Sequence, residues 1–161
     1  MYYKRKLIEH LIRELEANYQ TALTAANRAH STATDKANIA ENKYDTLALE
    51  AAYLAEGQAK RASECNADLK AIQQLTALDF SQSDAISMGA LVSLSDHDEK
   101  PLLLFLAPVS GGHKFIFEER TIVVITQSSP LGKTLLGKLV DDEFEFGSGQ
   151  HKKNYRITDI T

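Results

Sequence analysis

The chain has 161 residues, of which 43% are hydrophobic, a length that accommodates one compact domain with an extension or two small domains. Its 18 Lys and Arg are outnumbered by 22 Asp and Glu, which gives a net charge of −4. This balance argues against free nucleic acid as the main partner, because binding to phosphates needs a basic excess or a large basic face. We therefore expect no direct sequence-specific binding to nucleic acid.

The first half of the sequence has the pattern of two long helices separated by a polar turn. From Lys4 to His30 there is no Gly or Pro, and small or apolar side chains recur at helical spacing at Leu7, Leu11, Leu15, Ala22, Ala26 and Ala29. From Asn42 to Leu78 a second series alternates by three and four, as in a seam between two helices: Tyr44, Leu47, Ala51, Leu54, Gln58, Cys65, Ile72 and Leu75. Between the two series, polar side chains from Ser31 to Asn38 compete with the helix for backbone hydrogen bonds.

This pattern predicts a monomeric antiparallel coiled-coil hairpin over residues 1–78, with its turn at 31–38 and its tip at about 31–45. Two helices of this length form a rod of roughly 45–55 Å. Because the seam is rich in Ala rather than Leu, it buries little apolar area per residue. We interpret the rod as a probe whose chemistry lies at its tip.

The second half has the pattern of a small sheet. A polar linker at residues 79–84 is followed by short apolar runs between turn formers: Ile86 to Leu94, Leu102 to Leu106, Lys114 to Phe117, Ile122 to Thr126, Glu143 to Phe146 and Tyr155 to Ile160. Ser129 and Pro130 suit the cap and the first position of a short helix that ends before Gly137. We predict an α+β protein in which residues 85–161 form a mixed or antiparallel sheet with one short helix.

The sequence offers no arrangement typical of an autonomous active site. Gly132, Gly137 and Lys138 have the spacing of a phosphate-binding loop, but Leu139 occupies the position of the Ser or Thr that would hold magnesium. The five histidines include no pair at metal-ligand spacing, and no nucleophile, base and orienting acid fall together. Cys65 permits no internal disulfide, and no stretch is apolar for long enough to span a bilayer. We expect a soluble, cytoplasmic protein that is not an enzyme and binds no cofactor alone.

Acidic residues near the predicted tip are the candidate functional groups: Asp35, Glu41 and Asp45. One interpretation is structural, because Asn38 and Glu41 have the spacing of a capping box at the start of the second helix. The other is chemical, because a carboxylate at the end of a rod could supply an oxygen ligand to a magnesium ion that another protein holds. The two roles are compatible if Glu41 leaves its cap when the protein docks.

The segment from Val124 to Phe144 resembles the C-terminal signature of the Gre family, the transcript-cleavage factors of bacterial RNA polymerase. That signature has a Ser-Pro pair, a short helix ending in Leu/Ile-Gly-Lys, and Val-x-Asp-Glu ahead of a strand. The tip segment Ala40 to Tyr44, which includes Glu41 and Asn42, resembles the family's Ser-Glu-Asn segment, and Glu56-Gly57 also has a counterpart. The order of parts agrees as well, so the resemblance covers nearly the whole chain.

The resemblance implies an FKBP-like C-terminal domain that docks on the rim of the polymerase's secondary channel, while the hairpin brings its tip to the catalytic magnesium. The docking surface would include Ser128, Ser129, Pro130, Lys133 and Lys138. Magnesium would be shared with the polymerase, which remains the enzyme.

In the family, an Asp and a Glu three residues apart help the polymerase to hold a second magnesium ion and cleave backtracked RNA. Glu41 falls on that Glu, but Asn38 stands at the position of the Asp, and a neutral amide is a weaker magnesium ligand than a carboxylate. Either Asp35 or Asp45 substitutes for it, or the protein enters the channel without stimulating cleavage.

Two functions of other classes compete with this one. A coiled-coil adaptor unrelated to transcription is suggested by the polar residues Gln58 and Arg61 near the seam. A peptidyl-prolyl isomerase is suggested only by analogy of fold, and we rank it last because the chain has no Trp and no evident aromatic-lined pocket.

Overall fold

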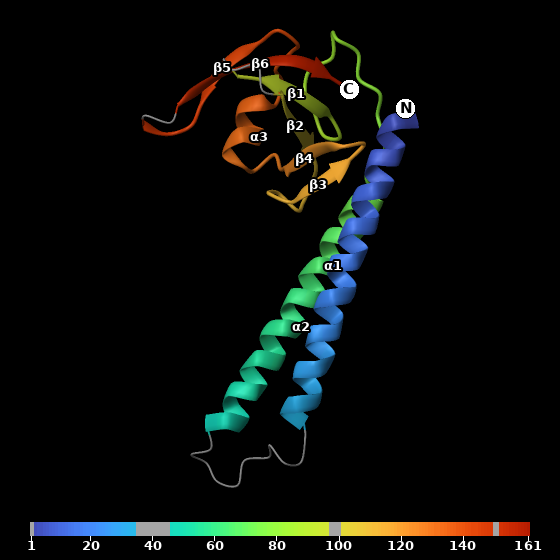
Figure 1. The fold of residues 1–161 in the computed structure, drawn as a ribbon, viewed down its shortest axis with the longest axis vertical. Coiled ribbons are helices and arrows are strands. Elements are labelled where there is room, and N and C mark those ends of the chain that lie inside the picture. Colours follow the sequence, from blue (N-terminus) through green and yellow to red (C-terminus); the bar gives the residue numbers. More distant parts are fainter. Residues whose placement is uncertain (1, 35–45, 97–100, 150–151) are drawn as a thin grey trace. The chain divides into compact units, whose positions relative to one another are not determined.

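The computed structural model describes residues 2–34, 46–96, 101–149 and 152–161 (Figure 1). In chain order its elements are α1 (Tyr2–Thr34), α2 (Thr46–Gln73), β1 (Leu91–Ser95), β2 (Pro101–Leu106), β3 (Lys114–Phe117), β4 (Arg120–Ile125), α3 (Pro130–Leu135), β5 (Glu143–Phe146) and β6 (Lys153–Ile160). This order of two long helices before a sheet with a short helix confirms the predicted α+β class. The chain forms two compact units: a sheet unit, Met1–Leu11 with Ala71–Thr161, and a helical unit, Ile12–Lys70.

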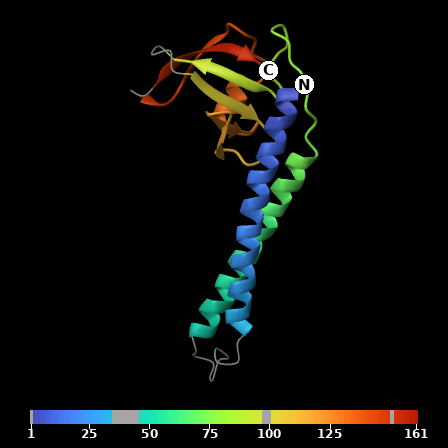
Figure 2. The same ribbon diagram turned by 45° about the vertical axis from the view of Figure 1, so that its right-hand side comes forward.

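Within the helical unit, α1 and α2 run antiparallel and side by side, as Figures 1 and 2 both show. The predicted series on α1 is confirmed here, since Leu15, Ala22 and Ala29 are buried. Among the described residues, no helix combines the length and the hydropathy that crossing a bilayer requires.

The packed face of α2 agrees with the predicted seam at Ala51, Gln58 and Cys65 and differs from it at two leucines. Leu47 and Leu54 are 72% and 58% exposed, and the helix ends at Gln73 rather than at Leu78. The predicted series includes the large side chains Leu47 and Leu54, whereas the less exposed positions in the helical unit are mostly small. They alternate by three and four as Ala48, Ala51, Ala55, Gln58, Ala62, Cys65 and Leu69. An alanine seam allows the two helices to approach closely, so the leucines are left outside it.

The first helix is longer than the sequence pattern predicts, because α1 continues past His30 to Thr34. The hydroxyl of Thr32 donates to the carbonyl of Arg28 at 3.1 Å, and that of Thr34 donates to the carbonyl of His30 at 2.9 Å. These side chains therefore bond within the helix instead of breaking it. The rest of the predicted turn lies outside the described residues.

The sheet unit contains a six-stranded mixed sheet in the order β3-β4-β2-β1-β6-β5. β2 and β4 are parallel, and the other neighbouring pairs are antiparallel. β1 pairs with β2, which follows it in the chain, and with β6, the last strand. The register on β6 shifts between Ser93 and Leu94, which marks a bulge. The sheet thus follows the mixed alternative of the prediction.

The first strand is shorter than predicted, because it begins at Leu91 rather than at Ile86. Ile86 is buried, but its N–H donates to the carbonyl of Lys138 at 2.8 Å, and its carbonyl accepts from the N–H of Gly137 at 2.9 Å. The start of the apolar run therefore stabilises the turn after α3 instead of joining the sheet.

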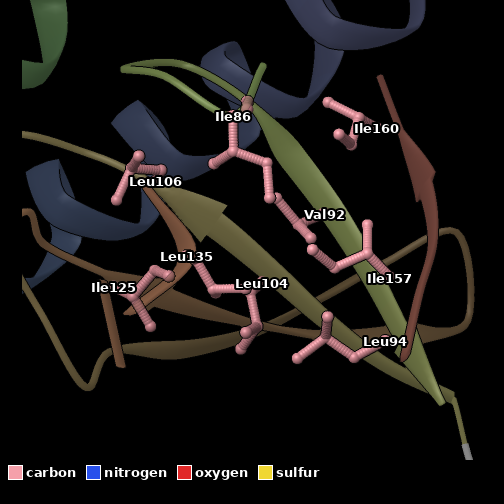
Figure 3. Packing of buried hydrophobic residues seen from close by; sticks show 10 residues of the cluster. Ile86, Val92, Leu94, Leu104, Leu106, Ile125, Leu135, Ile157 and Ile160 are labelled. Carbon is pink, nitrogen blue, oxygen red and sulfur yellow. The ribbon is translucent and has the colours of Figure 1, made fainter. Parts of the chain in front are cut away.

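One face of the sheet packs against α3 in a continuous hydrophobic core (Figure 3). Its buried members come from four strands, from α3 and from the segment before β1: Ile86, Ala90, Val92, Leu94, Leu104, Leu106, Ile125, Leu135, Ile157 and Ile160. Successive strand residues point to opposite faces, and Leu103, Phe105 and Ile122 are also buried. Both faces of the central strands are therefore covered, and α3 is held firmly at one of them.

Candidate functional site

The segment after β4, residues 126–138, is called the α3 segment here. Ser129 precedes the helix in an extended conformation, and its Oγ accepts a hydrogen bond from the N–H of Gly132 at 3.1 Å. The same hydroxyl donates to the carbonyl of Thr126 at 2.7 Å. Pro130 lies in the first turn, where a missing N–H costs nothing. The predicted capped helix is confirmed. The hydroxyl of Ser129 bonds to Thr126 before the helix and to Gly132 within it.

Gly132 determines how closely α3 approaches the end of β4. A Cβ at this position would lie 1.9 Å from the carbonyl oxygen of Thr126 and 3.0 Å from the Oγ of Ser129. No side chain fits this space without moving backbone. The glycine that sequence reasoning tested as part of a phosphate loop therefore has a packing role in the α3 segment.

The predicted docking residues differ in their exposure. Ser128, Pro130 and Lys133 are exposed, whereas Ser129 and Lys138 are partly buried. The hydroxyl of Ser129 is engaged in the cap, and the Nζ of Lys138 lies 5.9 Å from the centre of the Phe144 ring. The first three side chains are available to a partner, while the other two support the segment. Docking by this set stays a prediction.

A second loop lies beside the α3 segment, because the parallel strands β2 and β4 end at the same edge of the sheet. The N–H of Ala107 donates to the carbonyl of Ile125 at 2.9 Å, and the N–H of Gly112 donates to the carbonyl of Val124 at 2.8 Å. The Cβ position of Gly111 is 3.1 Å from the Cγ2 of Thr126. No local pattern in the sequence places this loop beside the α3 segment, because the parallel pairing of β2 and β4 brings the two together.

The predicted tip residues lie outside the described residues: Asp35, Asn38, Glu41, Asn42, Tyr44 and Asp45. Their roles stay predictions. Within the described ranges, no group of three or more His, Cys, Asp or Glu side chains is arranged to hold a metal ion.

The helical unit has a groove of about 540 Å³ between α1 and α2. Small side chains such as Ala26, Ala55 and Ala59 leave it open, and Asn27 and Glu56 contribute polar groups to its lining. Elsewhere on α2, Leu49, Tyr53 and Leu54 are exposed. The helical unit therefore presents apolar surface outside its own seam.

Proteins with similar sequences help to interpret these features. No protein-family model matches the chain. Transcription elongation factor GreA of Rhodospirillum rubrum is 28% identical over 145 residues, which span 90% of this chain and 87% of that protein. The chain is similar to GreA. A second GreA, from Sphingopyxis alaskensis, is 34% identical over 77 residues, 48% of this chain and 45% of that protein.

Solved structures give a weaker likeness. GreA factor homolog 1 (Gfh1) of Thermus thermophilus is 17% identical, with a TM-score of 0.38 over 97% of this chain and 93% of that one. Gfh1 of Thermus aquaticus is 19% identical, with a TM-score of 0.39 over 99% and 95% of the two chains. These TM-scores are too low to carry an argument about function. Support for a Gre-family relationship therefore comes from the GreA sequence matches.

Proposed function

We propose that this protein is a Gre-like transcription factor that binds bacterial RNA polymerase through its secondary channel and modulates elongation or RNA cleavage. The observation that carries the proposal is the match to GreA over 90% of this chain and 87% of that protein. The match covers both the helices and the sheet unit, so it relates the arrangement of the whole chain rather than one motif. The protein would act in the cytoplasm, as a monomer.

The two parts of the chain would have different tasks. The α3 segment presents Ser128, Pro130 and Lys133 on a rigid support, because Ser129 caps the helix and Gly132 packs against Thr126. These exposed groups would contact the polymerase rim. The hairpin would carry its tip to the catalytic magnesium.

The chemistry at the tip would belong to the polymerase. Glu41 would supply one oxygen ligand to a second magnesium ion, with Asp45 or Asp35 as a further carboxylate. The ion would be held between the two proteins rather than by this chain alone. Asn38 reduces the negative charge available at the tip, and this observation favours a second candidate function: a regulator that occupies the channel without stimulating cleavage.

Binding to purified core RNA polymerase, measured by biolayer interferometry, tests the proposal. Saturable binding of the wild type supports it, and absence of binding at micromolar concentrations would contradict it and leave the coiled-coil adaptor as the better hypothesis. Cleavage of RNA in a defined backtracked complex then separates the two candidate functions. Cleavage above the polymerase's own rate indicates a cleavage factor, and binding without added cleavage indicates a channel regulator.

A further inference from the structure

Lys4 is a charged residue at an unusual place in the sheet unit. It lies in the first turns of α1 and is only 1% exposed, although lysine is rarely fully buried without a partner. Lys6, two residues later on a different face of the helix, is exposed and serves as a natural comparison, because its Nζ also lies over an aromatic ring, 4.4 Å from the centre of Tyr2.

The partners of Lys4 come from two other parts of the sheet unit. Its Nζ donates to the carbonyl oxygen of Thr161 and lies 4.3 Å from the centre of the Phe80 ring. The same carbonyl accepts from the N–H of Leu91 at 2.9 Å, and the N–H of Thr161 donates back to the carbonyl of Leu91 at 2.9 Å. Lys4 therefore bonds to the point where the end of the chain pairs with the start of β1.

Other contacts of the same helical turns are ring contacts or lie at an exposed site. The Tyr3 ring meets Phe117 edge to face at 5.3 Å, and the His10 ring stacks on Phe115 at 5.8 Å. The Tyr3 hydroxyl also accepts from Arg120 at 2.7 Å, at an exposed site. Ring contacts tolerate small rotations and shifts, whereas a hydrogen bond to one partly buried main-chain oxygen weakens steeply with angle. Of the two side-chain hydrogen bonds described in these turns, that of Lys4 is the less exposed.

The burial of Lys4 disfavours the charged form of its side chain. Removal from water lowers the pKa of its ammonium group to about 8, and the nearby Asp79 carboxylate acts in the other direction. A buried charge of this kind adds little net stability compared with an apolar side chain of similar size. Replacement by Met would leave the main-chain oxygen of Thr161 bonded to the N–H of Leu91, so this oxygen would keep a hydrogen bond.

We propose that Lys4 is a positioning residue that fixes the rotation and register of the first turns of α1 on the sheet unit. The helix that carries Lys4 spans Tyr2–Thr34. The functional part of this inference rests on the proposed function: Lys4 would be needed for the effect on transcription and dispensable for binding to the polymerase.

Hydrogen exchange of the free, full-length protein tests the positioning role, with Lys4→Met compared with Lys6→Met. We expect about tenfold faster exchange at Ile8 to Leu11 in Lys4→Met, the loss expected for one hydrogen bond from a charged donor, without a fall in the denaturant midpoint. Lys6→Met should change neither quantity. Phe80→Leu keeps an apolar contact and removes the ring, so it should accelerate exchange at the same amides to a smaller extent.

Three exchange results would overturn the positioning role. They are unchanged exchange in Lys4→Met, acceleration spread evenly over the protein, and loss of folding, because each contradicts a local contact with little net stability. Acceleration confined to the first turns of α1 supports it.

The functional test uses the same variants with core RNA polymerase. We expect Lys4→Met to bind within about twofold of the wild type while its effect on transcription falls severalfold, and Lys4→Arg to restore part of the effect because it keeps a charged donor. If binding and effect fall together, or if the effect is unchanged, Lys4 has no separate positioning role in transcription. If the wild type does not bind polymerase, the proposed function fails, and the exchange experiment alone decides the role of Lys4.

Discussion

Gly132 lies so close to Thr126 that a Cβ on the glycine would be 1.9 Å from the threonine's carbonyl oxygen. We expect Gly132→Ala to reduce the free energy of unfolding by about 1–3 kcal/mol, because backbone must move to admit the methyl group. Urea denaturation measures this change. Gly57→Ala is the matched control, since nothing lies within 4 Å of its Cβ position and alanine favours a helix, so it should stabilise the protein by up to about 1 kcal/mol. Equal effects of the two substitutions would contradict the packing role of Gly132.

Neighbouring serines provide a second test of the α3 segment. Ser129→Ala should reduce the free energy of unfolding by about 0.5–2 kcal/mol, because it removes the acceptor for the Gly132 N–H at the start of the helix. Ser128→Ala should cost much less, since Ser128 is exposed and its Oγ contacts only the hydroxyl of Thr126, at 3.1 Å, among the described contacts. Thermal or urea unfolding of both variants measures the two losses of stability. A larger loss for Ser128→Ala would show that the cap is assigned to the wrong residue.

Docking through the α3 segment predicts a loss of affinity without a loss of fold. Combined substitution of Ser128 and Lys133 by Ala should weaken binding to core polymerase about tenfold, the effect of removing one contact of intermediate strength at an interface. Lys114→Ala removes an exposed lysine from β3 and should leave the affinity unchanged. Biolayer interferometry on immobilised polymerase compares the three proteins. If the double variant folds and binds as the wild type does, the α3 segment is not the docking surface.

The composition of the predicted tip leads to a prediction about cleavage. The wild type should stimulate RNA cleavage weakly or not at all, and Asn38→Asp should increase whatever activity exists, because a carboxylate binds magnesium more strongly than an amide does. Glu41→Ala should abolish the remaining activity and leave polymerase binding intact. A cleavage assay on a defined backtracked complex, with binding measured in parallel, provides the readout. Persistence of cleavage in Glu41→Ala, together with its loss in Asp45→Ala, would move the magnesium ligand one helical turn along the chain.

The burial of Lys4 predicts how the stability of the protein changes with pH. Its pKa is about 8 in the folded state, compared with an ordinary value of 10.5, so the unfolded chain binds more protons between these two values. The contribution of Lys4 to stability should therefore rise as pH increases from about 8 to about 10.5, and its penalty should be full below about 8. Urea denaturation at pH 7.5 and 9.5 measures the slope, with pH values chosen on either side of the lowered pKa. In Lys4→Met the slope should be smaller, and an equal slope in both proteins would assign the effect to other groups.

Much of the secondary structure could be predicted because local signals agreed with it. Leu7, Leu11 and Leu15 lie on one face of α1, and Ser129 with Pro130 starts α3 as their chemistry requires. The α2 seam is predicted only in part, because alanines such as Ala48, Ala55 and Ala62 belong to it and carry little weight in a hydrophobic pattern. Leu54 is a large apolar residue with more than half of its surface exposed, which periodicity alone cannot reveal.

The parts of the candidate site that escaped prediction depend on contacts distant in sequence. The loop around Gly111 lies beside Thr126 because β2 and β4 pair in parallel, and the buried Lys4 contacts Thr161 and Phe80. No local pattern marks either encounter. The α3 segment was predicted because its cap, proline and glycines are all within one short stretch.

Because β1 pairs with both β2 and the last strand, β6, we expect the sheet to be completed late in synthesis. Contacts such as that between Thr158 and Ser93 join residues 65 positions apart, and Lys4 bonds to a residue 157 positions away. Pairings this distant form slowly, because the entropy cost of closing a long loop comes before the contact contributes favourable free energy. The antiparallel helices of Ile12–Lys70 involve shorter separations, so they can form on the ribosome while the sheet still lacks β6. We expect a nascent chain stalled before β6 has emerged to display a folded helical hairpin beside an incomplete and protease-sensitive sheet.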